Sequence, residues 1–219
     1  MFDAIAESFK EGGWGMYPIA MVAVFIIAIG AERISYLYFK ARVNKEDFVN
    51  TMHKYLFQGN LQRAITYCSS NRAPLANIIK AGLLRIDGSE AEIQSAMDEV
   101  ALQEMPRIEK RTGYLAMLSN VAVLAGLLGT ITGLIKAFAA VSYADAAEKA
   151  VLLAKGISEA MNCTAFGLIA AIIALMGFAA HNTKTQKLLD DINSATVQVV
   201  NLVVNNRSKI NLDDLGQAA

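Results

Sequence analysis

Three long apolar segments stand out in the pattern of hydrophobic and polar positions along the chain. Residues 12–31, 112–135 and 160–180 contain no Asp, Glu, Lys or Arg, and these segments are 20, 24 and 21 residues long. An α-helix rises about 1.5 Å per residue, so roughly 20 apolar residues cross the hydrocarbon core of a bilayer. Helices of a soluble core keep a polar face, which these segments lack. The pattern therefore predicts an all-α membrane protein with three transmembrane helices.

The segments outside the apolar runs are polar and have the periodicity of helices rather than strands. In the segment 40–112, Pro74 is expected to open one helix, and Ser89 followed by Glu92 matches the capping box that opens another. After the third apolar run, residues at spacings of three and four form an apolar stripe: Leu188, Ile192, Ala195, Val199 and Val203. We therefore expect long helices that extend from the membrane into a cytoplasmic helical domain.

These patterns give the expected organisation of the chain. The N-terminus carries Asp3, Glu7 and Glu11 against Lys10, whereas a signal peptide begins with basic residues, so the first apolar run is interpreted as an uncleaved span. The expected parts are an outer, periplasmic segment (1–15), a first transmembrane helix (16–39), a cytoplasmic helical insert (40–112), a second transmembrane helix (113–141), a periplasmic loop (142–152), a third transmembrane helix (153–180) and a cytoplasmic helical tail (181–219).

The distribution of Lys and Arg near the span ends predicts the orientation. Basic residues cluster on the cytoplasmic side of membrane proteins. On one side lie Lys40, Arg42, Lys45, Arg107, Lys110, Arg111, Lys184 and Lys187; on the other lie only Lys10, Lys149 and Lys155. We therefore expect a multi-pass membrane protein with its N-terminus outside the cytoplasm and its C-terminus inside.

Composition removes several classes of function. The formal net charge is zero, so bulk charge indicates no nucleic-acid partner. Cys68 and Cys163 have neither an obvious pairing nor metal-ligand spacing, and His53 and His181 lack partners at ligand or triad spacing. We therefore expect no enzyme site, no metal and no cofactor.

Small residues recur on one face of each of the last two spans. The second span has Gly126, Gly129 and Gly133, which are three and four residues apart. The third span has Gly156 and Gly167, which are eleven residues apart. Small faces let membrane helices approach closely, because lipid offers no hydrophobic drive for helix association. Helix packing alone is the usual explanation of such a stripe.

Two threonines on these faces are the candidates for a polar function. Thr130 lies 11 residues before Val141, and Thr164 lies 11 residues after Leu153. Because the two spans run in opposite directions, both hydroxyls should lie about 16 Å below the outer surface, near mid-bilayer. They could form a polar girdle there. Alternatively, each hydroxyl could bond to a carbonyl of its own helix four residues back.

Three further polar residues lie near the expected outer ends of these spans. Lys136 and Glu159 should lie at similar depths, and Asn162 follows one turn later. We consider them candidates for the mouth of a pore, with Lys136 and Glu159 able to pair. The alternative is that each long charged side chain reaches the interface separately.

Two sequence motifs resemble those of a known family. The segment Gly126-Leu-Leu-Gly129-Thr130-Ile-Thr-Gly133 resembles the second-span signature of the TolQ/ExbB/MotA proton-channel family. The segment from Ala154 to Ala171, which includes Glu159, Thr164 and Gly167, resembles its third-span signature, and Glu32-Arg33 also fits. The three-span layout is similar to the TolQ/ExbB branch. Lys136, Lys155 and the pair Asn162-Cys163 depart from the usual pattern.

The resemblance implies a function and partners. It implies a pentameric ring of this chain around a dimer of an ExbD/TolR-like protein, whose single span bears an essential Asp, with an envelope-spanning third protein as a further candidate partner. Thr130 and Thr164 would line the proton pathway, and Glu159 would be the acidic residue before the third-span motif. The complex would convert the proton motive force into work on the envelope, in import, Tol-type constriction or gliding motility. The alternative is a passive oligomeric scaffold in the bilayer.

Overall fold

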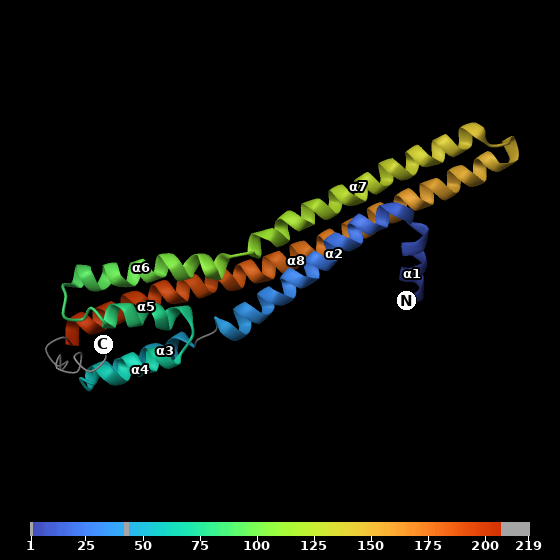
Figure 1. Cartoon of the computed structure of the whole chain (residues 1–219). Helices are drawn as coiled ribbons and strands as arrows, with labels where there is room; N and C mark the ends of the chain where they lie inside the picture. The colour runs from blue at the N-terminus through green and yellow to red at the C-terminus, as the bar shows by residue number, and fades with distance from the viewer. Residues whose placement is uncertain (1, 42–43, 207–219) are drawn as a thin grey trace. The chain divides into compact units, whose positions relative to one another are not determined.

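The computed structural model describes residues 2–41 and 44–206, and its regular secondary structure over these residues is helical (Figure 1). Its elements are α1 (Phe2–Glu11), a 3-10 turn η1 (Gly13–Gly15), α2 (Met16–Ser35), a π turn η2 (Tyr36–Lys40), α3 (Lys45–Phe57), α4 (Leu61–Ser70), α5 (Pro74–Leu83), α6 (Glu90–Glu109), α7 (Thr112–Tyr143) and α8 (Ala146–Asn206). They form two compact units. The first, Met1–Arg33 with Arg111–Ala180, is called the membrane unit below; the second, the described residues of Ile34–Lys110 and His181–Ala219, is called the bundle unit.

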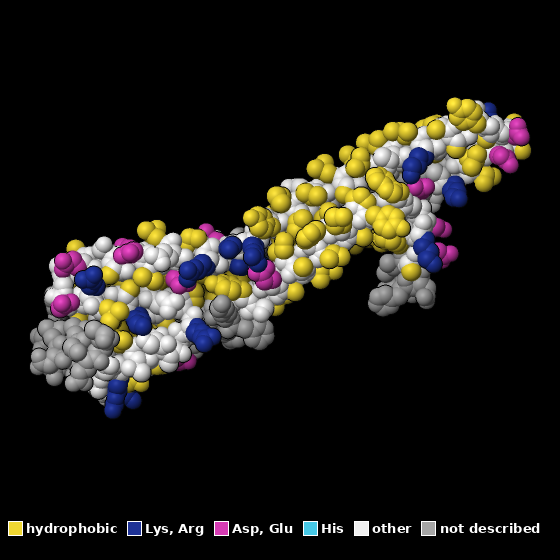
Figure 2. All heavy atoms as spheres, in the orientation of Figure 1, with side chains coloured by type: hydrophobic (Ala, Val, Ile, Leu, Met, Phe, Trp, Pro, Cys, Tyr) yellow, Lys and Arg dark blue, Asp and Glu magenta, His cyan; other side chains and the backbone are white. Residues whose placement is uncertain are grey.

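Three helical segments are long and apolar enough to cross a membrane: Gly13–Tyr38, Glu90–Tyr143 and Ala146–Asn205. This confirms the all-helical class and the three predicted membrane-length helices. Hydrophobic side chains cover the visible face of the membrane unit (Figure 2). Phe25, Leu124 and Met176 are 54%, 63% and 70% exposed. Such large apolar side chains on a surface are typical of contact with lipid or with another protein.

Within the membrane unit, α2, α7 and α8 pack through small side chains. Ile26 of α2 contacts a cluster that contains Leu115 and Ala122 of α7 and Ala171 and Ala174 of α8. Ser119 of α7 adds a bond between helices, because its hydroxyl donates to the carbonyl oxygen of Ala171 at 3.0 Å. The small residues bring the backbones close enough for that bond to form.

The bundle unit confirms the expected local signals. Pro74 occupies the first turn of α5, where its missing N–H is harmless. Ser89 and Glu92 form the complete capping box at the start of α6. The predicted apolar stripe of α8 is buried in the core of this unit, with Leu188, Ile192, Ala195, Val199 and Val203 each at most 6% exposed.

The connection between the last two spans is shorter than the expected loop of residues 142–152. Only Ala144 and Asp145 lie between α7 and α8. The carbonyl of Asp145 accepts from the N–H groups of Glu148 and Lys149, so helix begins at once. The segment Ala146–Leu152 is rich in Ala, Leu, Glu and Lys, which are strong helix formers. Arg42 and the part of the expected tail after residue 206 lie outside the described residues.

Candidate functional site

The hydroxyls of Thr130 and Thr164 are joined by a hydrogen bond between α7 and α8. The Thr130 hydroxyl is also 3.1 Å from the carbonyl oxygen of Gly126 and 3.2 Å from that of Ala160. Both arrangements that the sequence left open are therefore present at Thr130, the hydroxyl pair and the backbone bond at i−4. Both threonines are partly exposed, so the pair borders a surface of the membrane unit.

A hydroxyl carries a single proton, and this determines how the pair can donate. When Thr130 donates to a backbone carbonyl, Thr164 must supply the proton of the bond between the two hydroxyls. The Thr164 oxygen then retains a lone pair that can accept from an incoming group. When Thr130 donates to Thr164 instead, the Thr164 proton is free for an incoming acceptor. The pair can therefore serve either a donor or an acceptor by rotating two O–H bonds.

Glycines hold the two threonine-bearing helices at this distance. A Cβ on Gly126 would lie 3.1 Å from the carbonyl oxygen of Cys163, and one on Gly133 would lie 3.3 Å from the Ala160 Cβ. A Cβ on Gly167 would lie 2.8 Å from the carbonyl oxygen of Ala122. Gly129 and Gly156 likewise face α8 and α7 of the same chain. All five predicted packing glycines therefore lie between helices of one chain.

The turn η1 packs against the chain neighbours of the two threonines. The Cys163 thiol donates to the carbonyl of Gly12 at 3.2 Å, and a Cβ on Gly15 would lie 2.9 Å from the Cα of Gly129. Gly129 and Cys163 are the chain neighbours of Thr130 and Thr164, so the pair is level with the first turn of α2. The depth of the threonine pair in a bilayer stays a prediction. Its position beside Gly15 is closer to the start of the first span than the depth of about 16 Å obtained from residue counts.

The three candidate pore-mouth residues lie elsewhere around the hairpin. The Lys136 ammonium is 5.9 Å from the ring centre of Trp14, and a Cβ on Gly13 would meet the carboxylate of Glu159. Across the described residues the two charges form no ion pair with each other, because each contacts a different residue of the turn. Asn162 is partly exposed and two positions from Thr164, so helical geometry puts it on another side of α8.

An ion pair that sequence reasoning missed ties the other ends of α2 and α7. Arg111 donates to the carboxylate of Glu32, and this hydrogen bond raises the pKa of Arg111. The backbone φ angle of Arg111 is 67°, in the left-handed region, and α7 begins at the next residue. Opposite charges at adjoining ends of two predicted spans were the available signal. The pairing itself required the fold, because the two residues are 79 positions apart.

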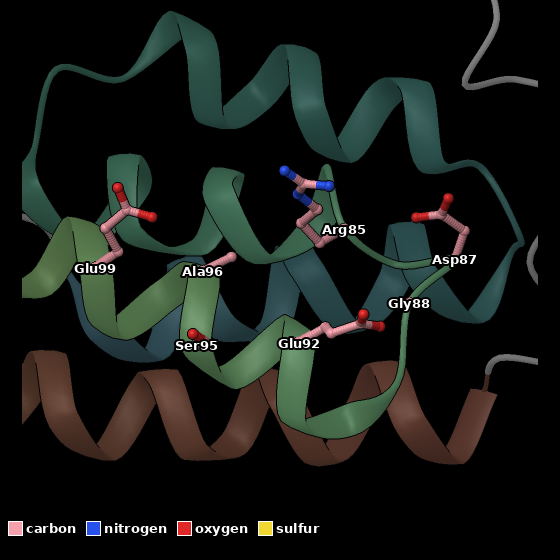
Figure 3. Close-up of a pocket in the computed structure, with 7 residues that line it drawn as sticks. All are labelled: Arg85, Asp87, Gly88, Glu92, Ser95, Ala96 and Glu99. Carbon is pink, nitrogen blue, oxygen red and sulfur yellow. The ribbon is translucent and has the colours of Figure 1, made fainter.

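The bundle unit contains a hollow at the turn between α5 and α6 (Figure 3). It is lined by Arg85, Asp87, Gly88, Glu92, Ser95, Ala96 and Glu99. Glu92 accepts from the backbone N–H of Ser89 at 2.6 Å, so this carboxylate serves the helix cap. Among the residues with described positions, no group of three His, Cys, Asp or Glu side chains could hold a metal ion.

Comparison with known proteins assigns the chain to a family. Residues 70–194 match the model of the MotA/TolQ/ExbB proton channel family. A putative biopolymer transport protein ExbB homolog from Methanothermobacter thermautotrophicus is 29% identical over 175 residues, which cover 80% of this chain and 61% of that protein. The biopolymer transport protein ExbB of Salmonella typhimurium is 29% identical over 182 residues, covering 74% of each chain.

A shorter match and a solved structure agree with this result. The Tol-Pal system protein TolQ of Haemophilus influenzae is 39% identical over 95 residues, covering 42% of this chain and 41% of that protein. The solved structure of C. jejuni MotAB has the same fold, with a TM-score of 0.61 and 17% identity over 95% of this chain and 80% of that one. The chain is a membrane protein that belongs to the MotA/TolQ/ExbB proton channel family.

Proposed function

We propose that this chain is the proton-conducting subunit of a motor channel, in which Thr130 and Thr164 line the proton path. The observation that carries the proposal is the bonded, partly exposed hydroxyl pair on the seam between two apolar helices. Family members work in complexes with ExbD, TolR or MotB. The partner proposed here is a dimer of an ExbD/TolR-like protein with one span that bears an Asp. Proton motive force is then converted into work on the cell envelope.

The pair suits a carboxyl group that changes its protonation state. An ionised Asp inside a span is unfavourable, by about 2.5–3.5 kcal/mol on insertion scales when it lies at the centre. The two hydroxyls can donate to the carboxylate or accept from the protonated acid after rotation of their O–H bonds. A Lys at this place would hold the charged form alone. The residues 112–135 and 160–180 contain no acid, and the proposal takes the carboxyl from the partner's span.

The driving force is large enough to bias a mechanical step. One charge that crosses 100 mV supplies about 2.3 kcal/mol. That free energy shifts a two-state equilibrium by roughly fiftyfold, since about 1.4 kcal/mol is tenfold. A ring of identical chains, a pentamer by resemblance, would repeat the step around the partner. The inner membrane, with the N-terminus outside and the C-terminus inside, is the proposed location.

A passive scaffold is the second candidate, and one observation favours it. Thr130 bonds to the backbone of its own helix, and the glycines pack α7 on α8 with no need of a partner. In that case the threonines would contribute to packing alone. A membrane hydrogen bond contributes about 0.6 kcal/mol on average, so its loss should leave the scaffold assembled.

Removal of single hydroxyls distinguishes the proton channel from the passive scaffold. Thr130→Val and Thr164→Val keep nearly the same shape, and we expect both variants to assemble with the partner and to lose proton flux in liposomes. Thr130→Ser and Thr164→Ser should keep part of the flux because the hydroxyl remains. Thr132→Val is the matched control, because the Thr132 hydroxyl bonds only to its own helix, at 2.9 Å to Leu128 and 3.1 Å to Gly129.

The assay needs the complex that the chain forms when it is purified with its native partner. Full proton flux in both Val variants, at normal assembly, would refute the pore assignment and support the scaffold. Loss of assembly in Thr132→Val would show that hydroxyls in this segment are structural.

A further inference from the structure

One exposed amide interrupts the apolar surface of the membrane unit. Asn120 lies in α7, within the charge-free segment 112–135, and its side chain is exposed. In the part of the chain that the structure describes, this amide has no hydrogen-bond partner. By contrast, Ser119 beside it is buried and bonded to Ala171.

An unpaired amide is unfavourable on a surface that faces lipid. The hydrocarbon core offers no water to satisfy its donors and acceptor, and polar side chains inside membranes therefore face protein or a water-filled path. The amide of Asn120 can donate two bonds and accept two. Its exposure inside an apolar span indicates that the surface around it is covered by protein or water.

Helical geometry places Asn120 on the side of α7 that the threonine pair borders. Thr130 lies ten residues after Asn120, a rise of about 15 Å and a rotation about 80° short of three whole turns. Gly129 lies about 100° from Thr130 in the opposite sense and contacts Gly15 of η1. Asn120 therefore points away from η1 and α2, on the open side of the α7–α8 seam.

The rest of this face is apolar. On α7 it contains Val123 and Leu127, which are 40% and 51% exposed, and on α8 it contains Met161 and Leu168, which are 67% and 45% exposed. Between these two levels, residues 120–130 of α7 and 164–174 of α8, the hydrogen-bonding side chains are Asn120 and the threonine pair. Consider a second straight helix that lies along the seam and has a polar side chain against Thr130. It reaches the level of Asn120 about 15 Å, or ten residues, further along its own axis.

We propose that Asn120 is a second hydrogen-bonding residue of the ion path, which binds the partner's single transmembrane helix about ten residues from the Asp, toward the Arg111 end of α7. The inference rests on the proposed function, because it takes the partner helix to lie over the threonine pair. A single helix contacts both polar levels of one face. The partner helix is the proposed occupant because this face is continuous with the threonine pair, over which the proposed function places that helix.

Photo-crosslinking in cells that also express the native partner tests this contact. A benzoylphenylalanine is placed at Asn120, at Leu127 on the same face, and at Phe25 as the matched control. Phe25 is ten residues from Gly15 and so lies at the same level on α2, and it is 54% exposed on the other side of the hairpin. We expect adducts with the single-span partner at 120 and 127 and none at 25.

The outcomes separate this inference from the proposed function. Partner adducts at 127 with none at 120, or adducts at 120 with a second copy only, would overturn the inference and leave the proposed function standing. No partner adduct at either position would overturn both. Asn120→Leu should lower co-purified partner by about threefold, the value of one average membrane hydrogen bond, and Asn120→Ser should restore part of it. Wild-type recovery and flux in Asn120→Leu would also overturn the inference.

Discussion

At the scale of residues, the membrane unit depends on the absence of side chains at a few positions. The clearest is Gly167, where a Cβ would lie 2.8 Å from the carbonyl oxygen of Ala122 and 2.9 Å from the Cα of Gly126. Both neighbours are backbone atoms, which cannot move without shifting α7. Gly177 on the same helix has nothing within 4 Å of the equivalent Cβ.

This contrast predicts opposite effects of one substitution on one helix. Gly167→Ala should push α7 and α8 apart, weaken the bond between the threonines and lower the melting temperature of the solubilised protein. Gly177→Ala should leave the melting temperature unchanged or raise it, because Ala favours helix over Gly by about 1 kcal/mol. Thermal unfolding of the two variants in one detergent measures the difference. Equal melting temperatures would contradict the close packing at Gly167.

A buried thiol gives a second prediction at this scale. Cys68 is fully buried in the bundle unit, 3.9 Å from the sulfur of Met52. Burial raises the pKa of Cys68 from 9.0 to about 12, and the positive charge of Lys80 opposes this only in part. The folded chain should therefore keep Cys68 protonated and unreactive toward maleimide at pH 8, whereas urea-unfolded chain should react.

The pH dependence of stability has a definite sign. The folded pKa of Cys68 is the higher one, so the contribution of this group to stability is complete below pH 9 and is lost as the pH rises toward 12. Ser69→Cys, an exposed neighbour on α4, is the control that should react in the folded state. Rapid labelling of Cys68 at pH 8 in folded protein, located by mass spectrometry, would contradict its burial.

At the scale of elements, helix ends in the bundle unit are held by caps. The Ser89 hydroxyl accepts from the Glu92 N–H at 3.3 Å, and the Glu92 carboxylate accepts from the Ser89 N–H at 2.6 Å. The hydrogen bond from the Ser89 backbone is the largest cause that lowers the pKa of Glu92. The cap begins α6 directly after the turn that contains Gly88 (Figure 3).

Loss of the cap should destabilise α6. Ser89→Ala should cost about 1 kcal/mol of unfolding free energy, while Ser95→Ala, an exposed site on the same helix, should cost less than half of that. Chemical unfolding followed by circular dichroism measures both. Because the pKa of Glu92 is lowered in the folded state, its share of the cap is present at neutral pH and is lost as the pH falls below its ordinary value of 4.5. Ser89→Ala keeps the backbone N–H that binds Glu92, so Glu92→Gln tests the role of this carboxylate, and a pH-independent difference between Glu92→Gln and wild type would contradict that role.

At the scale of the whole molecule, the small faces of α7 and α8 are used inside one chain. The predicted packing glycines contact the other helix of the same hairpin. We therefore expect copies of the chain to associate through other surfaces, such as the large exposed apolar side chains of the membrane unit. Gly133→Leu therefore tests the packing of α7 on α8 within one chain rather than an interface between chains.

We predict that the chain forms a homo-oligomer without its partner. Large apolar side chains on both α7 and α8 remain exposed in a single chain, and helix association in lipid depends on packing of this kind. Native mass spectrometry from mild detergent should show several copies, and Thr130→Val should show the same number. A monomer of the unmodified chain at all detergent concentrations would contradict the prediction.

The sequence alone determined the features that depend on local chemistry. Charge-free runs of 20 to 24 residues indicate spans, because the hydrocarbon core excludes charge over a fixed thickness. Ser89 with Glu92 and the stripe from Leu188 to Val203 indicate a cap and a buried face, because both depend on spacing along a single helix. The family resemblance of the two motifs named Thr130 and Thr164 as candidates, and their role in a proton path stays a proposal.

Only the tertiary structure decided which residues from distant segments meet. Lys136 contacts Trp14 rather than Glu159, and Arg111 pairs with Glu32, because η1 and α2 pack on the hairpin in one particular register. Residue counts from the loop could not place the threonines beside the start of α2, since the helices continue almost to the turn. Asn120 gave no signal by itself, and its meaning came from exposure on the face that the hydroxyl pair borders. Spacing along one helix is fixed by backbone geometry, whereas contacts between helices depend on packing over the whole unit.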